Sequence, residues 1–354
     1  MTKVVCTGGG TAGHVVPALP VIEHMIAQRW RVVFIGSRSG LEERLVRPFN
    51  VPFHSITTGK LRRYWSIDNL FDCFRVPIGI FQAIRILRKE QPDVVFSKGG
   101  YVAFPTVIAA WLFGIPVVAH ESDVSPGLAN RLCFWSLNSL CVNFDSTRVS
   151  VRRLVVTGTP IRRSLLEGNA DRGRDRLGFQ QRRPIILVIG GSLGALSLNR
   201  LIREALDQLT AEFNVVHVCG PGNLDATLGN ASRYLQLEFV DDGWGDVLAS
   251  ADVVVSRAGA NSVIELLTLG IPNILVPLPT AVSRGDQIEN AEVARLEGYS
   301  TVLLEDELNA DVLTQTIREV FSEHRAWVQR LSRFQSKDAL GLIVSEIERA
   351  VANG

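Results

Sequence analysis

Short runs of apolar, β-branched residues alternate with longer segments of helical periodicity along this chain of 354 residues. Continuous apolar strands separated by helices are typical of parallel sheets that are covered on both faces. A first series of predicted strands comprises Val4–Thr7, Val32–Ile35, Val94–Ser97, Val117–His120, Leu140–Asn143 and Leu154–Thr157. A second comprises Ile185–Ile189, Val215–Cys219, Leu235–Phe239, Val253–Ser256, Asn273–Val276 and Thr301–Leu304. The pattern therefore predicts an α/β protein with two Rossmann-like domains.

The two series are separated by a polar, charged stretch over residues 167–183. We expect an N-terminal domain over 1–162 and a C-terminal domain over 163–354, whose last helix could pack back onto the first domain. Both halves begin alike, with a strand, a glycine-rich loop and a helix. The first loop is Gly8–His14 and the second is Gly190–Ala195.

Composition narrows the class of protein. Hydrophobic residues make up 46% and charged residues 21%, which fits a globular protein and gives no sign of disorder. The five cysteines are scattered and form no C-x-x-C pair, so we expect a reducing compartment and neither zinc nor disulfides. Because the N-terminus runs straight into an apolar strand, we also expect no signal peptide.

The uncharged stretch over 101–119 is long enough to raise the question of a membrane span. Pro105, Gly114 and Pro116 interrupt it, however. Proline leaves backbone groups unpaired in a lone span, so we predict a buried helix over 105–113 and a buried strand over 116–119.

Charge is distributed unevenly. Residues 1–160 hold 18 Lys and Arg against 10 Asp and Glu, and the remainder holds 19 against 26, so the first half should meet something anionic. Within residues 60–90, apolar side chains recur at helical spacing, at Leu70, Phe74, Ile78, Phe81 and Ile84. Basic residues flank them, at Lys60, Arg62, Arg63, Arg75, Arg85, Arg88 and Lys89. This segment suits an anionic membrane surface, and an ordinary amphipathic helix packed on the sheet is the alternative.

Glycines at a strand-to-helix turn let backbone N–H groups approach an anion. The spacing of Gly8, Gly10 and Gly13 satisfies the dinucleotide fingerprint. The acidic partner expected after the second strand is missing, because Ile35 is followed by Gly-Ser-Arg. An NAD site is thus disfavoured, while Arg38 would suit the 2′-phosphate of NADP, and an NADP-dependent oxidoreductase stays open.

Ligands of open parallel sheets bind beyond the carboxyl ends of the strands, so the polar residues there are candidates for a site. In the first half they are His14, Lys98–Tyr101, His120–Asp123 and Asn130. In the second half they are Ser192, Ser256–Gly259, Glu265 and Ser283–Asn290. Gln287 and Asn290 share a helical face, and amides suit sugar hydroxyls because they both donate and accept.

These strings, in this order, resemble the MurG family, bacterial transferases that convert lipid I to lipid II in peptidoglycan synthesis. The matching strings are Gly9–His14, Gly99–Val102, His120-Glu121, Gly127–Asn130, Thr157–Arg162, Gly190–Ala195, Arg257 with Gly259 and Glu265, and Asp286 to Ala291. The chain departs from the family pattern at Leu193, where Gln is common, and at Ser122-Asp123, where Gln-Asn is common.

The resemblance implies a GT-B fold, with two Rossmann-like domains and parallel sheets facing a cleft. It implies inverting transfer of N-acetylglucosamine (GlcNAc) from UDP-GlcNAc to the MurNAc 4-hydroxyl of undecaprenyl-diphosphate-linked MurNAc-pentapeptide. Expected donor-binding residues are Thr11, Gly13, Arg162, Ser192, Gly194, Val240, Arg257, Gly259, Glu265, Gln287 and Asn290. Among these, Glu265 would hold the ribose, Gln287 and Asn290 the GlcNAc hydroxyls, Ser192 and Arg162 the diphosphate, and the backbone around Val240 the uracil. Expected acceptor-binding residues are Gly10, Tyr101, Asp123 and Asn130.

Inverting transfer needs a base for the acceptor hydroxyl and stabilisation of the departing UDP. His14 is our first candidate for the base, because a helix N-terminus keeps a histidine neutral. His120, Glu121 and Asp123 are rivals for that role. The sequence has no D-x-D motif, so we predict metal-independent catalysis without a cofactor.

The resemblance also implies a peripheral enzyme on the cytoplasmic side of the inner membrane, with no nucleic-acid partner. Two further alternatives stay open. One is a glycolipid synthase of similar fold. The other is a catalytically silent sugar-nucleotide-binding module, which the departures at Leu193 and Ser122-Asp123 would fit.

Overall fold

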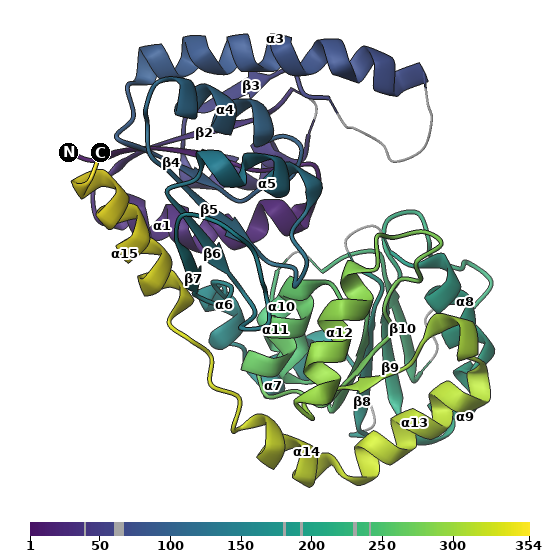
Figure 1. Cartoon of the computed structure of the whole chain (residues 1–354). Coiled ribbons are helices and arrows are strands. Elements are labelled where there is room, and N and C mark those ends of the chain that lie inside the picture. The colour runs from purple at the N-terminus through teal and green to yellow at the C-terminus, as the bar shows by residue number, and fades with distance from the viewer. Residues whose placement is uncertain (39, 60–66, 180–181, 192–193, 229–231, 241) are drawn as a thin grey trace. The chain divides into compact units, whose positions relative to one another are not determined.

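The computed structural model describes residues 1–38, 40–59, 67–179, 182–191, 194–228, 232–240 and 242–354, with the backbone alone over 67–74. The chain forms two compact units. Unit 1 comprises residues 1–161 and 337–354, and unit 2 comprises residues 162–336. Each unit holds one parallel sheet flanked by helices (Figure 1), so the predicted α/β class with two Rossmann-like sheets is confirmed.

The sheet of unit 1 has the strand order β3-β2-β1-β4-β5-β6-β7. Its strands are β1 (Lys3–Thr7), β2 (Arg31–Ser37), β3 (Phe53–Ile56), β4 (Val94–Ser97), β5 (Val117–Glu121), β6 (Ser139–Val142) and β7 (Leu154–Val156). The chain fills the sheet in one direction from β1 and then in the other from β4. The point of reversal between β1 and β4 is where open α/β sheets bind ligands, beyond the carboxyl ends of the strands.

Strand β3 has no counterpart among the predicted strands. It lies at the edge of the sheet and pairs only with β2. Its sequence Phe-His-Ser-Ile is half exposed, so it carries polar residues and lacks the continuous apolar run of a central strand.

Helices cover both faces of this sheet, and alternate residues of each strand point to opposite faces. On one face, Val4 and Cys6 of β1 pack with α1 (Leu19–Ala27) and α15 (Ala339–Ala352). On the other, Val5 packs with α3 (Ile67–Glu90) and α4 (Phe104–Leu112). Helix α15 comes from the end of the chain and completes the core of unit 1. The shorter helices are η1 (Ala12–His14), η2 (Val16–Ala18), α2 (Glu42–Val46), η3 (Arg47–Phe49), α5 (Leu128–Cys133) and η4 (Phe134–Ser136).

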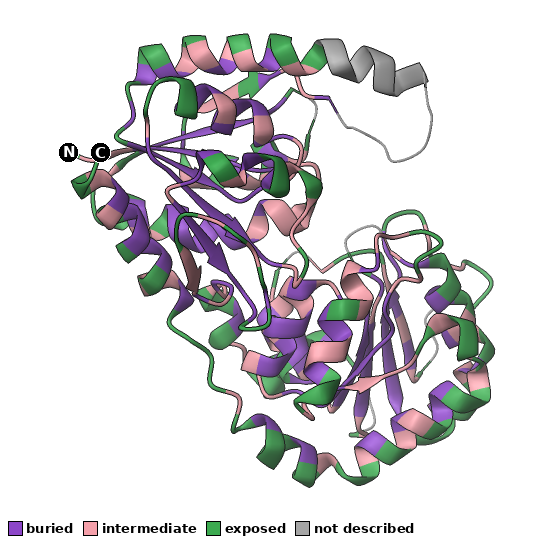
Figure 2. Cartoon of the chain, viewed as in Figure 1, coloured by how far each residue is buried: buried purple, intermediate pink, exposed green. Residues whose placement is uncertain are grey.

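Over residues 75–90, most of helix α3 is exposed or half-buried (Figure 2), and the buried residues of this part are Gly79, Ala83, Leu87 and Glu90. Ile78 and Phe81, by contrast, are 51% and 57% exposed. Of the predicted apolar positions with described side chains, Ile78 and Phe81 are therefore largely exposed, whereas Ile84 packs against the core of unit 1. Some predicted positions of this segment fall outside the described side chains, namely Lys60, Arg62, Arg63, Leu70 and Phe74.

The predicted buried helix over 105–113 is correct only in its first half. Residues 105–107, 109 and 110 of α4 are buried, whereas Trp111, Leu112 and Phe113 at its end are exposed.

The sheet of unit 2 has the strand order β10-β9-β8-β11-β12-β13, with its reversal between β8 and β11. Its strands are β8 (Ile185–Ile189), β9 (Asn214–Val218), β10 (Tyr234–Leu237), β11 (Val253–Ser256), β12 (Asn273–Leu275) and β13 (Thr301–Val302). Its helices are α6 (Arg163–Leu166), α7 (Ala170–Leu177), α8 (Leu196–Glu204), α9 (Leu206–Glu212), α10 (Trp244–Ala249), α11 (Ala260–Thr268), α12 (Asp286–Leu296), η5 (Glu305–Glu307), α13 (Ala310–Ser322) and α14 (His324–Leu331). Helices α8 and α13 share a core with β8 and β11 through Leu198, Leu313 and Val255.

Candidate active site

The first glycine loop follows β1, at the reversal point of unit 1. The backbone N–H of Gly10 in this loop donates a hydrogen bond to Oε1 of Glu42 at 2.8 Å. The hydroxyl of Ser37 donates to the other carboxylate oxygen at 3.0 Å. Glu42 is fully buried at the start of α2. An internal carboxylate therefore accepts the hydrogen bond that a phosphate oxygen would accept in a dinucleotide-binding loop.

The first glycine loop interlocks with the loop after β4. The backbone N–H of Gly9 donates to the carbonyl oxygen of Gly99 at 3.3 Å. A Cβ on Gly10 would lie 2.4 Å from the ring of Tyr101, and one on Gly99 would lie 2.7 Å from the amide of Asn130. These glycines are thus required by close packing, and three predicted acceptor residues, Gly10, Tyr101 and Asn130, come together here.

The carboxylate of Glu121, at the end of β5, organises the loop that follows it. Its Oε1 accepts from the backbone N–H of Asp123 at 3.1 Å, and its Oε2 accepts from the N–H of Gly127 at 2.9 Å. The same Oε2 accepts from Nδ2 of Asn130 at 2.9 Å. Glu121 is 2% exposed. Its oxygens are engaged inside the protein, which leaves little capacity for a ligand.

The imidazole of His120 is fully buried, and its Nε2 lies 2.8 Å from the carbonyl oxygen of Gly158. A carbonyl accepts only, so Nε2 carries the proton. Burial first, and then the charge of Lys98, hold the pKa of His120 well below its usual range. His120 is thus a neutral side chain closed off from solvent, and it joins β5 to the loop after β7.

His14 and Asp123 are the half-buried members of the same cluster. The ring of His14 lies against Gly100, where a Cβ would come within 3.0 Å of its Cδ2. The charge of His14 also acts on Glu121. The structure therefore brings His14 to the same edge of the sheet as Glu121 and Tyr101, and His14 keeps access to solvent.

The predicted donor residues divide between the two units. Thr11 and Gly13 lie on the first glycine loop in unit 1, and the others belong to unit 2. Ser192 and Leu193 fall outside the described residues of the second glycine loop. The described part of that loop packs on the end of β9, since a Cβ on Gly194 would lie 2.2 Å from the carbonyl oxygen of Cys219.

Helix α8, which follows this loop, is tied to the sheet by buried polar side chains. Nδ2 of Asn199 donates to the carbonyl oxygen of Cys219 at 2.9 Å, and its Oδ1 lies 3.0 Å from Nε2 of His217. The other ring nitrogen of His217 lies 2.9 Å from the hydroxyl of Tyr234. This network fixes the helix start that the sequence assigns to phosphate binding.

Glu265 lies on α11, two turns from the end of β11. Burial raises the pKa of its carboxyl to about 6, against the opposing effect of the Arg162 charge. Arg162 precedes α6, and its buried Nε has no hydrogen-bond partner among the described residues. Unit 2 therefore holds a carboxyl whose pKa is raised and which interacts with a guanidinium whose Nε lacks a hydrogen-bond partner among the described residues. Such perturbed groups are enriched at ligand sites.

Four further donor residues lie near the carboxyl ends of the same strands. Gly259 precedes α11, and a Cβ there would meet open space. Oε1 of Gln287 accepts from the N–H of Leu278 at 3.1 Å. Asn290 is fully buried, and its Nδ2 donates to the carbonyl oxygen of Ala258 at 3.3 Å. Val240, beyond the end of β10, is partly exposed.

Arg257 occupies a different setting from the one expected of a donor contact. The guanidinium is 5% exposed and donates to the carbonyl oxygen of Val276 at 3.1 Å and to Oγ of Ser197 at 2.9 Å. It also pairs with the carboxylate of Glu305. Arg257 therefore links α8, β12 and η5 inside unit 2, and its sequence motif did not indicate these partners.

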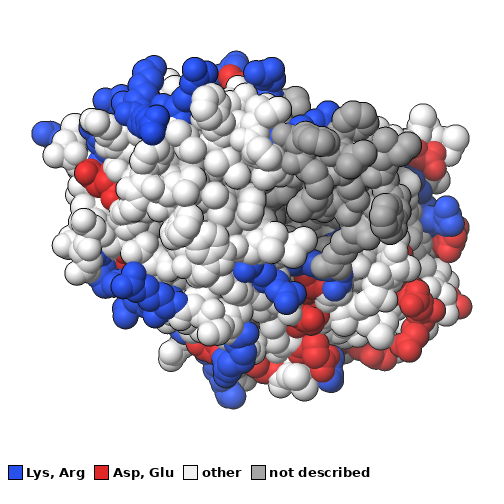
Figure 3. Space-filling model, turned by 45° about the horizontal axis from the view of Figure 1, so that its top comes forward, with Lys and Arg blue, Asp and Glu red and all other residues white. Residues whose placement is uncertain are grey.

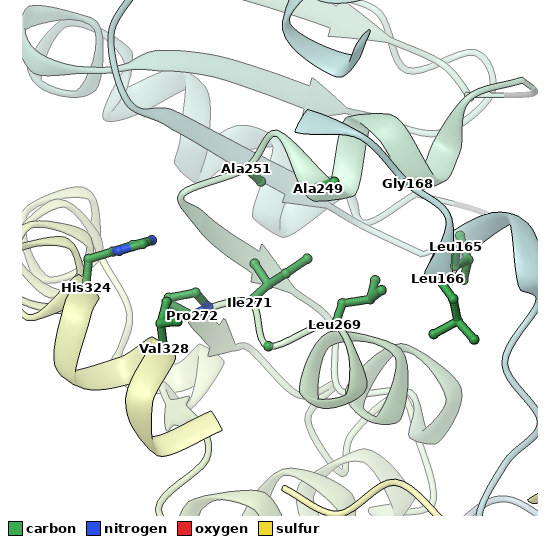
Figure 4. Close-up of a pocket in the computed structure, with 11 residues that line it drawn as sticks. Leu165, Leu166, Gly168, Ala249, Ala251, Leu269, Ile271, Pro272, His324 and Val328 are labelled. Atoms are coloured by element: carbon green, nitrogen blue, oxygen red, sulfur yellow. The ribbon is translucent and has the colours of Figure 1, made fainter. Parts of the chain in front are cut away.

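A cavity of about 310 Å³ lies at the opposite edge of unit 2, beside the loops that precede β11 and β12 (Figure 4). Its lining residues are Leu165, Leu166, Gly168, Ala249, Ala251, Leu269, Gly270, Ile271, Pro272, His324 and Val328. It faces the amino ends of the strands, so it does not coincide with the candidate donor residues.

Sequence reasoning gave no role to Glu42 or to the pair Trp111 and Trp135, and it named Lys98 only among the polar residues at the ends of the strands. The position of Glu42, an acidic residue soon after the second strand, could have drawn attention to it. Lys98 could have been noticed as a lysine directly before a pair of glycines. The aromatic rings of Trp111 and Trp135 pack edge to face, with centroids 4.5 Å apart, although the residues are far apart in sequence.

Comparison with known proteins places these features in a family. Residues 4–142 match the glycosyltransferase family 28 N-terminal domain, and residues 185–342 match its C-terminal domain. The chain is 48% identical over 349 residues to the UDP-N-acetylglucosamine--N-acetylmuramyl-(pentapeptide) pyrophosphoryl-undecaprenol N-acetylglucosamine transferase of Legionella pneumophila (strain Paris), which covers 98% of this chain and 96% of that protein. The similarly named protein of Clostridium tetani is 42% identical and covers 98% of each.

Solved structures agree. The crystal structure of Acinetobacter baumannii MurG matches with a TM-score of 0.76 and 29% identity, covering 99% of this chain and 100% of that one. The glycosyltransferase of kitacinnamycin matches with a TM-score of 0.74 at 18% identity, which speaks for the fold alone, and covers 99% of each chain. By the two domain matches and by identity over nearly its whole length, the chain belongs to the MurG family within glycosyltransferase family 28.

Proposed function

We propose that this enzyme transfers GlcNAc from UDP-GlcNAc to the MurNAc 4-hydroxyl of an undecaprenyl-diphosphate-linked MurNAc-pentapeptide, with inversion at the sugar. The observation that carries the proposal is 48% identity, over 98% of the chain, to a relative whose name states this activity.

Unit 2 supplies the donor side in this proposal. The ionised carboxylate of Glu265 accepts hydrogen bonds from the ribose hydroxyls, and the guanidinium of Arg162 meets the diphosphate. The amide of Gln287 faces the GlcNAc hydroxyls, because its Nε2 donors are left over when Oε1 accepts from Leu278. Asn290 holds the same helix in place through Ala258.

Unit 1 supplies the acceptor side and the base. Among His14, His120, Glu121 and Asp123, we assign proton abstraction to His14. His120 is sealed in the protein as a neutral ring, and Glu121 is engaged by three hydrogen bonds. His14 retains access, and the neighbouring carboxylate of Glu121 would stabilise the imidazolium that forms when it takes the proton.

The oxidoreductase alternative loses its main support. It rested on the first glycine loop and Arg38, yet the N–H of Gly10 is already used by Glu42. A nucleotide diphosphate at this loop would meet a buried carboxylate, and like charges in a low dielectric repel strongly.

We also propose that unit 1 binds an anionic membrane through an apolar surface formed by Ile78, Phe81, Trp111, Leu112, Phe113 and Trp135. All six side chains are more than a third exposed. Two arginines stack on this surface: the guanidinium carbons of Arg85 and Arg88 lie 4.9 Å and 5.1 Å from the ring centroids of Phe81 and Phe113. Figure 3 shows a broad uncharged area with Lys and Arg gathered along its border. Apolar side chains with a cationic rim are the composition of an interfacial site.

Peripheral attachment at the cytoplasmic side of the inner membrane remains part of this proposal. In the described part of the chain, no helix is both long enough and apolar enough to cross a bilayer. The sequence suggested residues 60–90 as the membrane segment. The exposed end of α4 adds Trp111, Leu112 and Phe113 to the proposed surface.

The proposal is tested by UDP release from UDP-GlcNAc with a panel of acceptors. We expect turnover with the lipid-diphosphate-linked MurNAc-pentapeptide and little turnover with diacylglycerol, the acceptor class of a glycolipid synthase. UDP, but not NADP, should raise the melting temperature. Turnover should persist in EDTA. Binding of UDP without turnover on any lipid-diphosphate acceptor would instead indicate a silent sugar-nucleotide-binding module.

A further inference from the structure

Lys98, the residue after β4, is a buried cation at the centre of the acceptor-side cluster. It is 1% exposed, and its Nζ donates a hydrogen bond to Oγ of Ser122 at 2.7 Å. Its Cβ and the backbone oxygen of His14 both lie against Gly8. Lys98 therefore sits between the loops that follow β1 and β5, beneath the residues proposed to handle the acceptor.

A buried ammonium needs negative charge nearby, since its desolvation otherwise drives the proton off. Burial lowers the pKa of Lys98 to about 8, and the carboxylates of Glu121 and Asp123 act in the opposite direction. The ammonium thus persists near neutral pH because two carboxylates balance it.

The balance also works in reverse. Burial by itself would raise the pKa of Glu121, but the charge of Lys98, followed by that of His14 and by the hydrogen bonds from Gly127 and Asn130, outweighs it, and the pKa is lowered. Of these influences, the charge of Lys98 is the strongest that favours the carboxylate. The titratable groups that face Lys98 are Glu121 and Asp123, together with His120 and, next to Glu121, His14.

We propose that Lys98 is a positioning residue for glycosyl transfer: its buried ammonium, which donates to Ser122, lowers the proton affinity of His14 and offsets the carboxylates of Glu121 and Asp123, which raise it. This inference rests on the proposed function. It also accounts for Ser122-Asp123, the departure from the family pattern noted above. Ser122 supplies the acceptor for the ammonium, and Asp123 supplies a second negative charge.

The test is a set of charge variants: Lys98→Met, Asp123→Asn and the double variant. Met matches the length of lysine without its charge, and Asn is isosteric with Asp. The two readouts are the pKa of His14, followed by NMR of its imidazole, and the acid limb of the kcat/KM profile, which reports ionisations of the free enzyme.

Loss of the cation makes protonation of His14 easier, so Lys98→Met should raise its pKa and move the acid limb upward by about one pH unit. Loss of a carboxylate has the opposite sign, so Asp123→Asn should move both downward by about half a unit. The double variant should lie within about 0.3 units of the wild type, because the two charges compensate one another.

The proposal is overturned if the pKa of His14 stays unchanged in both single variants, or if the shifts have the opposite sign. Should Lys98→Met fail to fold, Asp123→Asn decides alone, since it alters a half-buried side chain. The NMR readout needs no turnover, so the two proposals can fail separately. A wild type that transfers no sugar contradicts the proposed function. An active wild type whose His14 titrates at the same pH as in the variants contradicts only the role of Lys98.

Discussion

The backbone N–H of Gly10 donates to the carboxylate of Glu42 at 2.8 Å, so a side chain of the protein itself accepts a hydrogen bond from the first glycine loop. The two glycine loops look alike in sequence, yet only the first has this internal carboxylate among the described contacts. The loop serves as a packing platform on which Tyr101 and His14 are set.

Replacing Glu42 with Ala should loosen this platform. The N–H of Gly10 and the hydroxyl of Ser37 lose their buried acceptor, which typically costs about 1–3 kcal/mol. We expect a corresponding fall in the free energy of unfolding in urea and a lower kcat/KM for the acceptor, with unchanged affinity for UDP. Glu43→Ala is the matched control, because the neighbouring Glu43 forms only an exposed pair with Arg47. Equal effects of the two variants would contradict the role of Glu42.

Replacing His14 with Ala should lower kcat at least about 100-fold, because the acceptor hydroxyl loses its base. The Kd of UDP-GlcNAc, measured by calorimetry, should change little. His24→Ala, which removes a histidine outside the cluster, should keep normal turnover. Near-normal turnover of the His14 variant would remove this residue from the role of base.

Affinity for UDP should depend on pH through Glu265. Its pKa is raised to about 6, and ribose hydroxyls donate to the carboxylate rather than to the acid. Binding should therefore weaken as the pH falls below about 6, by up to about tenfold per pH unit. Glu265→Gln should bind UDP weakly at every pH and lose the dependence. A wild-type Kd that is constant between pH 5 and 7, or a variant that keeps the slope, would refute this assignment.

The same raised pKa affects stability. Between about pH 4.5 and 6, the folded protein binds more protons at Glu265 than the unfolded chain does, so stability falls as the pH rises through this window. Above it, Glu265→Gln should be more stable than the wild type by about 1–2 kcal/mol, as measured in urea. A variant that is less stable at pH 8 would show that the ionised carboxylate is favourably paired.

Arg257 should matter for folding more than for direct donor contact. Its removal leaves Glu305 and the carbonyl oxygen of Val276 without their partner, and breaking a buried pair costs about 3–5 kcal/mol. We expect Arg257→Ala to lose that much stability. Arg295→Ala, which removes an exposed pair with Glu292, should lose about 0.5 kcal/mol or less. If Arg257→Ala kept wild-type stability but lost UDP binding, Arg257 would instead be a direct donor contact.

Membrane binding should depend on the apolar surface of unit 1. Phe81→Asp with Trp135→Asp should reduce sedimentation with anionic vesicles at least about tenfold, since each change removes an exposed ring that would enter the membrane and adds repulsion. Leu296→Asp, at a 70% exposed apolar position of unit 2, is the control. Added salt should weaken wild-type binding. Equal binding by all three proteins would rule this surface out.

The sequence predicted the central strands closely because their apolar runs are continuous, as in Ile185–Ile189 and Val253–Ser256, which match the structure. It missed β3, whose edge position permits His54 and Ser55. Helical periodicity in α3 did not reveal which residues pack on unit 1, because Gly79 and Ala83 are buried and are small residues with little hydrophobic signal.

The motifs also predicted at which edge of each sheet their residues lie, but not how deeply those residues are buried. Asn290 and His120 stand in motifs as polar candidates, and both are fully buried. Depth depends on which side chains pack above each residue, and one-dimensional spacing does not contain that information. The pairing of Lys98 with Ser122 joins residues 24 positions apart, so it too could be found only in three dimensions.

The most direct test of the central claim is product analysis after incubation of the enzyme with UDP-GlcNAc and the undecaprenyl-diphosphate-linked MurNAc-pentapeptide. Mass spectrometry should show the gain of one N-acetylhexosamine per acceptor with one UDP released, and NMR should show a β-linkage at the MurNAc 4-hydroxyl. An unchanged acceptor, or a product that retains the α-configuration of the donor, would contradict the account.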